Sequence, residues 1–275
     1  LLSCCFVLMF IPELPAQVNL TLKSATTDEA KLPGWECGSM LLLKNNMATA
    51  PLTGEGLQQS SAVKAQSALY QIPVVFHVIS DPGNPTAIPS YAQVQMQLAS
   101  LNAAFSNSLA SLNNVTVGPR AFDTQIQFCF AKTKQVNGNP TAWPTSSVGV
   151  VYYSINNSLT TNINVNSNPS LATLAALTNA NFPPSMYLNI WCVPNITTSG
   201  ATNVNAPPTV IGIGTFPWMT APIDGIVMRN DVIGNNTYNN FTGNMLSTLD
   251  KGNILAHEAG HYLGLLHTFE TVVGG

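Results

Sequence analysis

The stretch IPVVFHVIS at residues 72–80 has the clearest hydrophobic pattern of the N-terminal half of the chain. Apolar side chains occupy both alternating sets of positions, which is typical of a strand that is covered on both faces. The stretch also contains His77. A single histidine in such a strand is more often a packed, hydrogen-bonded residue than a metal ligand. We therefore predict a buried strand here and give His77 no catalytic role.

A helical pattern follows at residues 90–108. Ser90 and Gln93 have the spacing of a capping box, which marks the start of a helix. Apolar residues then recur at helical spacing at Val94, Leu98, Leu101 and Phe105. This periodicity predicts a helix that packs one face against the core.

Later apolar stretches predict further strands, and polar segments separate them. The predicted strands are residues 124–131, 148–153 and 187–193, with edge strands or cleft walls at 210–217 and 224–228. Segments 154–169 and 195–209 are rich in Asn, Thr and Ser, and we expect them to be loops. A strand, a helix, several strands and a late helix, in that order, predict an α/β or α+β fold.

The N-terminal part of the chain differs from the rest. The apolar run LLSCCFVLMFI is too short to span a bilayer, so we interpret residues 1–16 as part of a secretory signal peptide. A buried N-terminal strand is the alternative. Residues 17–69 lack firm periodicity and are interpreted as a pro-segment or a flexible extension. Residues 70–275 are expected to form the main folded domain, without a membrane anchor.

Composition narrows the class of protein. Hydrophobic residues make up 45% of the 275 residues, which is enough for a core, but only 8% are charged, against about a quarter in an average protein. The net charge of −3 and the lack of a basic run give no indication of nucleic-acid binding. A weakly charged surface fits a secreted, extracellular protein. Nothing in the sequence indicates the oligomeric state.

Three of the four histidines lie within HEAGHYLGLLH, at residues 257–267. The surrounding LDKGNILAHEAGHYLGLLH predicts a helix, with Asp250 as its cap. His257 and His261 are four residues apart, so both imidazoles project from one face and can reach one small cation. Glu258 lies about 100° around the helix, where it can flank the site and act as general base.

Gly264 explains how a third histidine can join the other two. In a continuous helix, His267 would lie about 15 Å along the axis from His257. Glycine readily ends a helix in the left-handed conformation, so the chain can turn back there. Three imidazoles and one water form an open, catalytic zinc site. A helix that contains histidines by chance is the alternative, and the long, regular motif favours the metal site.

The block HEAGHYLGLLHTF resembles the zinc signature of the metzincin metalloproteases, and in particular that of the pappalysin family. IPVVFHVI, LASLNAAF, YLNIWCV, GIGTFP and DGIVM resemble upstream blocks of that family, so the resemblance covers about residues 72–270. It implies a metzincin-like upper catalytic subdomain with a twisted mixed five-stranded sheet, a backing helix and an active-site helix. The lower subdomain and its Met-turn would lie beyond Gly275. After HTF the sequence continues as ETVVGG, where the family usually has a Gly-Gly-Cys segment.

The resemblance also implies a function. The protein would be a secreted zinc-dependent endopeptidase, with residues 70–275 as its catalytic domain, that hydrolyses proteins or peptides through a zinc-bound water. His257, His261 and His267 would bind one catalytic Zn²⁺, and Glu258 would activate the water. Some relatives bind Ca²⁺, but no residue here can be assigned to it. The alternative is a catalytically inactive homologue or fragment that binds metal or peptide.

The cysteines allow two interpretations. Family members often carry Cys-Gly in the pro-segment, so Cys37 is a candidate ligand that would keep a zymogen silent. Alternatively, Cys37 pairs with Cys129 or Cys192. If Cys37 is the switch, Cys129 and Cys192 are bonded to each other or simply buried.

Overall fold

The computed structural model describes most of the chain after residue 68. The described residues are 21–22, 35–36, 69–82, 88–108, 123–143, 146–157, 162–164, 168–197, 209–219, 222–235, 252–267 and 272–273. One short 3-10 helix, η3, covers the three residues Asn230–Val232. None of the helices in these ranges is long and apolar enough to cross a membrane.

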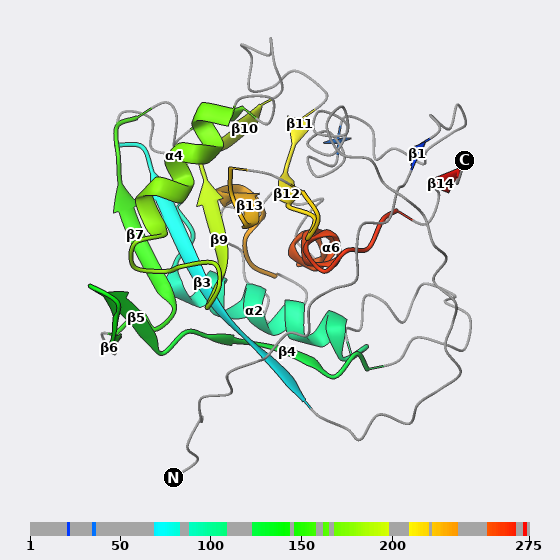
Figure 1. Cartoon of the computed structure of the whole chain (residues 1–275), viewed down its shortest axis with the longest axis horizontal. Coiled ribbons are helices and arrows are strands. Elements are labelled where there is room, and N and C mark those ends of the chain that lie inside the picture. Colours follow the sequence, from blue (N-terminus) through cyan, green and yellow to red (C-terminus); the bar gives the residue numbers. More distant parts are fainter. Residues whose placement is uncertain are drawn as a thin grey trace.

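A twisted, mixed sheet forms the centre of the molecule (Figure 1). Its strands are β3 (Tyr70–Ser80), β4 (Ile126–Phe130), β7 (Val150–Ser154), β9 (Leu188–Val193), β12 (Gly212–Gly214) and β13 (Gly225–Arg229). The order is β12-β13-β9-β3-β4, and β7 also pairs with β3. All neighbours run parallel except β12, which is antiparallel to β13.

Although it contains six strands, the sheet is five strands wide. β4 pairs with the first half of β3, up to Val74, and β7 pairs with the second half, from Phe76. β9 pairs with the middle of β3 and overlaps both partners, so it must occupy the opposite edge. β4 and β7 therefore follow one another along a single edge of β3. This agrees with the expected mixed α/β sheet.

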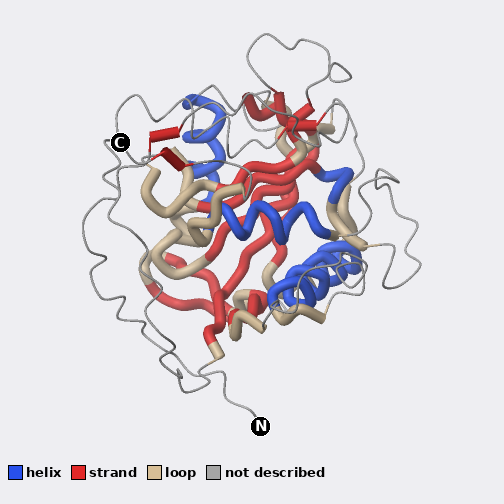
Figure 2. Tube along the Cα trace, turned by 90° about the vertical axis from the view of Figure 1, so that its right-hand side faces the viewer, coloured by secondary structure: helices blue, strands red, loops and turns tan. Residues whose placement is uncertain are grey.

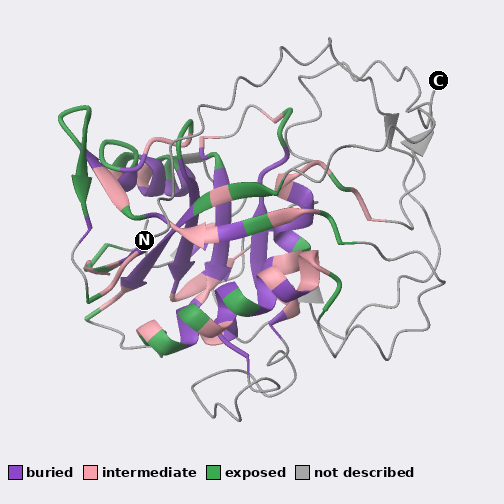
Figure 3. Ribbon diagram, turned by 90° about the horizontal axis from the view of Figure 1, so that it is seen from below, coloured by how far each residue is buried: buried purple, intermediate pink, exposed green. Residues whose placement is uncertain are grey.

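Helices cover both faces of the sheet. α2 (Tyr91–Phe105) and α6 (Asn253–Tyr262) share one core cluster with the sheet, and α4 (Asn168–Thr178) belongs to the cluster on the other face. Figure 2 shows α4 on the left of the strands and α2 on the right. The central strands are mostly buried, whereas α2 has buried and exposed residues side by side (Figure 3).

Four short pairings complete the described structure. β5 (Thr133–Val136) and β6 (Asn139–Ala142) form a hairpin, and β8 (Asn162–Asn164) pairs with β10 (Asn195–Thr197). β2 (Trp35–Glu36) pairs with β11 (Thr209–Val210), and β1 (Thr21–Leu22) pairs with β14 (Val272–Val273). β2 and β1 bring two parts of the N-terminal segment next to the later chain.

The strongest sequence predictions are confirmed. Residues 70–80 form the buried central strand, and α2 begins after Ser90 with both hydrogen bonds of the capping box. His77 is packed and hydrogen-bonded as expected. Its Nε2 atom donates to Asn189 Oδ1 (2.9 Å), and its Nδ1 atom accepts from the Tyr153 hydroxyl (3.3 Å).

Three other predictions need correction. The segments interpreted as loops contain the short strands β8 and β10, and residues 168–178 form α4, which was not predicted. The N-cap of α6 is Gly252, not Asp250. No disulfide joins Cys129 to Cys192. These residues lie on β4 and β9, which pair with opposite edges of β3. Their Cα atoms are therefore separated by at least two strand spacings of about 4.8 Å each, which is too far for a disulfide.

Candidate metal centre

The start of α6 is fixed by contacts with α2. Gly252 has a left-handed backbone (φ 74°), and a Cβ atom there would lie 2.7 Å from Ser100 Cβ. Its carbonyl accepts a hydrogen bond of 3.0 Å from the Gln97 side chain. One side of α6 then packs into the core through Leu255 and Ala259, which are both fully buried. The other side is left to carry His257 and His261.

Gly264 ends the helix as the sequence predicted. Its φ of 93° is in the left-handed region, where glycine is favoured. Its N–H group donates to the His261 carbonyl (2.9 Å), and the N–H group of Leu265 donates to the Gly260 carbonyl (2.8 Å). These two bonds make a complete Schellman motif. The chain consequently reverses within a few residues and returns toward the face that carries the histidines.

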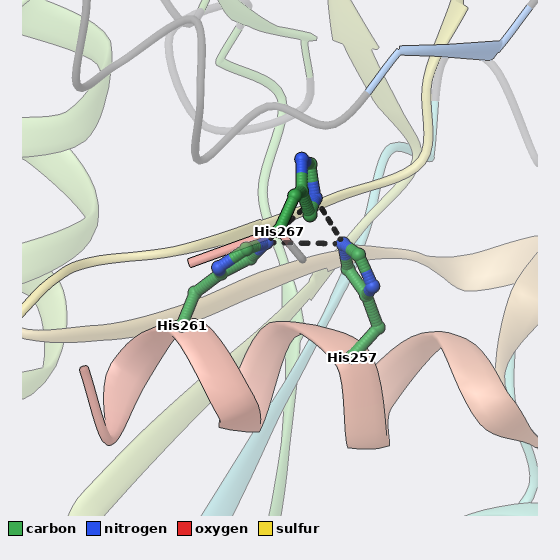
Figure 4. Close-up of side chains that lie close together, drawn as sticks. All are labelled: His257, His261 and His267. Carbon is green, nitrogen blue, oxygen red and sulfur yellow. Dashed lines mark hydrogen bonds between the residues drawn. The ribbon is translucent and has the colours of Figure 1, made fainter. Parts of the chain in front are cut away.

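The three predicted ligand histidines converge at this turn (Figure 4). The Nε2 atoms of His257 and His261 are 3.0 Å apart, and His267 Nε2 lies 3.1 Å from the former and 3.2 Å from the latter. They form the group in the described residues whose geometry suits a metal ion. Ligand atoms about 2.0–2.1 Å from a tetrahedral zinc lie about 3.3 Å apart, so the spacing fits that ion closely.

The same turn orients His261. Its Nδ1 atom donates a hydrogen bond of 2.7 Å to the Leu265 carbonyl, because a carbonyl oxygen can only accept. Nδ1 therefore carries the proton, and the lone pair of Nε2 is directed into the cluster. A partner of this kind fixes the orientation of a metal-binding histidine and increases its basicity. The buried Phe216 ring, 5.1 Å from the imidazole centroid, packs against His261 from the side.

The histidines are held in the neutral form that binds metal. The pKa of His257 is lowered to about 4, mainly by desolvation and to a smaller extent by the nearby imidazoles of His261 and His267. This holds although part of the His257 side chain is exposed to solvent. Desolvation also lowers the pKa of His261 to about 4, against the opposing effect of its bond to Leu265. Both rings are thus uncharged at neutral pH, as a cation requires of its ligands.

Glu258 lies on α6 beside the histidines but outside the cluster of ligands. Only 2% of its surface is exposed, and its side chain packs against the backbone of Gly212 in β12. Cys37, the other predicted site residue, lies outside the described residues.

Sequence reasoning missed several residues that shape the site. Leu265 acts through its backbone, which no side-chain motif reveals. Gly212 and Gly214 lie directly against α6, and their alternation in GIG was the available signal. Tyr262 forms a hydrogen bond with Asp224, which links the end of α6 to the connection before β13. Burial and then the neighbouring Asp224 raise the pKa of Tyr262 well above its usual range.

Comparison with known proteins locates this arrangement among solved structures. No protein-family model and no curated protein matches the chain. Mature mirolysin from Tannerella forsythia, in complex with a cleaved peptide, is 27% identical over 74% of this chain and 66% of its own, with a TM-score of 0.53. Mirolysin in complex with compound 9 is 26% identical over 74% of this chain and 65% of its own, with the same TM-score.

The likeness supports a metalloprotease fold for this chain. The chain spans slightly less than two thirds of the length of each of these structures.

Proposed function

We propose that the chain belongs to a secreted, zinc-dependent endopeptidase of the pappalysin type. The observation that carries the proposal is the triangle of histidine Nε2 atoms, with sides of 3.0–3.2 Å, next to a buried glutamate. His257, His261 and His267 would hold the zinc ion. Three protein ligands leave a coordination position open, which is the arrangement of catalytic rather than structural zinc sites.

Glu258 is the proposed general base. Zinc, when bound, supplies a Lewis acid that lowers the pKa of water and polarises the peptide carbonyl. A carboxylate oxygen of Glu258 would take the proton of the attacking water and deliver it to the leaving amine. The near-complete burial of Glu258 supports this role, because a carboxylate away from bulk water can be held in one orientation. Gly264 and the Leu265 carbonyl would keep the ligands in place.

The proposed substrate is a protein or peptide. Mirolysin has been solved with a cleaved peptide, and the last strand of the sheet in this chain, β12, packs beside α6. An extended peptide would add to β12 as a further strand, with its backbone pairing to the strand. The cofactor that we propose is one zinc ion for each chain.

The N-terminal segment is proposed to be a leader (1–16) and an inhibitory pro-segment (17–69). The pairing of β2 with β11 supports this, since it places Glu36 beside Val210, two residues before β12. Cys37 is the next residue after Glu36 and would be the ligand that silences the zymogen.

The test is a zinc titration together with a peptide-cleavage assay. We expect one zinc per chain, and we expect Glu258→Gln to bind zinc as wild type does but to lose cleavage. His267→Ala, as the control for the metal, should lose both properties. Cleavage by Glu258→Gln at the wild-type rate would refute the proposed mechanism. Zinc binding by the wild-type protein without any cleavage would instead favour a metal-binding homologue.

A further inference from the structure

Two glycines of β12 lie against the active-site helix. Side chains alternate along a strand, so Gly212 and Gly214 face α6, whereas Ile213 is fully buried in the core cluster on the other side of the sheet. Neither glycine has a left-handed backbone. Their conformation therefore accepts any residue, and the need for glycine must come from the space around them.

The atoms nearest to the Cβ position at Gly212 belong to the Glu258 side chain. A Cβ atom on Gly212 would lie 2.8 Å from Glu258 Cγ, 2.9 Å from Oε1 and 3.0 Å from Cδ. Ordinary carbon contacts begin at about 3.5 Å. The stem and the carboxylate of Glu258 thus occupy the volume that a side chain at position 212 would take. Because Glu258 is 2% exposed, the carboxylate has little room to move elsewhere.

The space at Gly214 is filled by a different part of the helix. A Cβ atom there would collide with the backbone carbonyl of Glu258 and would lie 3.3 Å from His261 Cβ. Backbone atoms of a packed helix yield only if the whole helix moves. Gly214 thus sets the distance between β12 and α6, whereas the three atoms nearest to the Cβ position at Gly212 all belong to the Glu258 side chain.

We propose that Gly212 is a positioning residue that holds the Glu258 carboxylate in its working orientation. The proposal rests on the proposed function for its consequence in catalysis, but the contact itself does not depend on zinc or on turnover. A methyl group at position 212 displaces the carboxylate and leaves the histidines where they are. A methyl group at position 214 shifts the helix and, with it, the histidines.

The first experiment is a double-mutant cycle in thermal unfolding of the full chain without metal. Gly212→Ala, Glu258→Ala and the double variant are compared with wild type. Alanine in a compatible backbone normally stabilises a protein by restricting the unfolded chain. In the Glu258→Ala background, Gly212→Ala should therefore raise the melting temperature. In the wild-type background Glu258 opposes the methyl group, so the melting temperature should fall or rise by clearly less. Additive effects would overturn the proposal.

The second experiment compares zinc binding and cleavage by Gly212→Ala and Gly214→Ala. Gly212→Ala should bind zinc within about twofold of wild type, because no ligand moves, while kcat falls at least tenfold and KM changes little. Gly214→Ala should bind zinc at least tenfold more weakly, as expected when the support of a ligand is disturbed. Equal weakening of zinc binding by both variants would overturn the assignment. If the wild-type chain cleaves no peptide, the proposed function fails. The melting temperatures and zinc affinities still test the contact between Gly212 and Glu258, because neither measurement depends on turnover.

Discussion

Replacing Gly264 by alanine tests whether the turn after α6 holds the metal ligands. A non-glycine residue in the left-handed region costs about 1–2 kcal/mol, and alanine returns part of this, about 0.4–1 kcal/mol, by restricting the unfolded chain. The net loss of stability should be about 1 kcal/mol. The new Cβ atom would also lie 3.2 Å from Trp218 Cζ3, so the indole must shift by a few tenths of an ångström.

The same change should weaken zinc binding. If the turn relaxes, the Leu265 carbonyl leaves His261 Nδ1 and His267 loses its approach to the other two rings. Loss of such a supporting partner typically lowers metal affinity by about 10–100-fold. Competition with a chromophoric zinc chelator measures the affinity, and urea unfolding in the presence of excess chelator measures the stability of the metal-free chain.

Gly138→Ala is the matched control. Gly138 also has a left-handed backbone (φ 77°), but nothing lies within 4 Å of the position where its Cβ atom would be, and it lies in the β5–β6 turn. It should lose about the same stability, about 1 kcal/mol, and keep wild-type zinc affinity. If Gly264→Ala also keeps wild-type affinity while losing this stability, the turn is not what holds the ligands.

Three further predictions concern the buried histidine, the capping box and the pro-segment. Burial lowers the pKa of His77 to about 4, whereas the pKa in an unfolded chain is about 6.5. Between pH 6.5 and pH 4, His77 is therefore protonated in the unfolded state but not in the folded state. His77 should thus contribute about 3 kcal/mol to the drop in the free energy of unfolding between pH 6.5 and pH 4. His77→Gln should remove this contribution in urea titrations, and an unchanged pH dependence would contradict the prediction. Ser90→Ala should lower the free energy of unfolding by about 1 kcal/mol, because the Gln93 N–H group loses the Ser90 hydroxyl as its acceptor. An unchanged urea midpoint would show that the cap is dispensable. Cys37→Ala should give a full-length protein that cleaves peptide without processing, and a variant as silent as the wild-type precursor would exclude the thiol switch.

Elements with strong local signals were predictable from the sequence. The apolar run of β3 and the capping box of α2 act over a few residues, so the chain reveals them without knowledge of its partners. The turn at Gly264 was predictable for the same reason.

Two elements that the sequence analysis missed also had local signals. α4 has Leu171, Leu174, Ala175 and Thr178 at helical spacing, and the β5–β6 hairpin has the Asn137-Gly138 pair that is typical of a tight turn.

Other features depend on contacts that a single sequence does not reveal. The N-cap of α6, Gly252, must be a glycine because its backbone is left-handed and because Ser100, on a helix some 150 residues earlier in the chain, leaves no room for a side chain. The contact of Gly212 with Glu258 likewise joins two segments that meet only in the folded sheet. The metal-binding and catalytic residues of the candidate site were thus predictable from one sequence motif, whereas the packing that orients these residues was not.

The position of β3 has a consequence for how the protein is made. Its buried run from Val74 to Ile79 contains neither a charge nor a proline, and it is bordered only by strands that come later in the chain. Val75 lies beside Asn189, 114 residues further on (189 − 75). At about 5–20 residues per second, a ribosome reaches β9 on the order of ten seconds after completing β3. During that interval an aggregation-prone segment has no native partner on that edge, so the nascent chain depends on late, cooperative closure of the sheet.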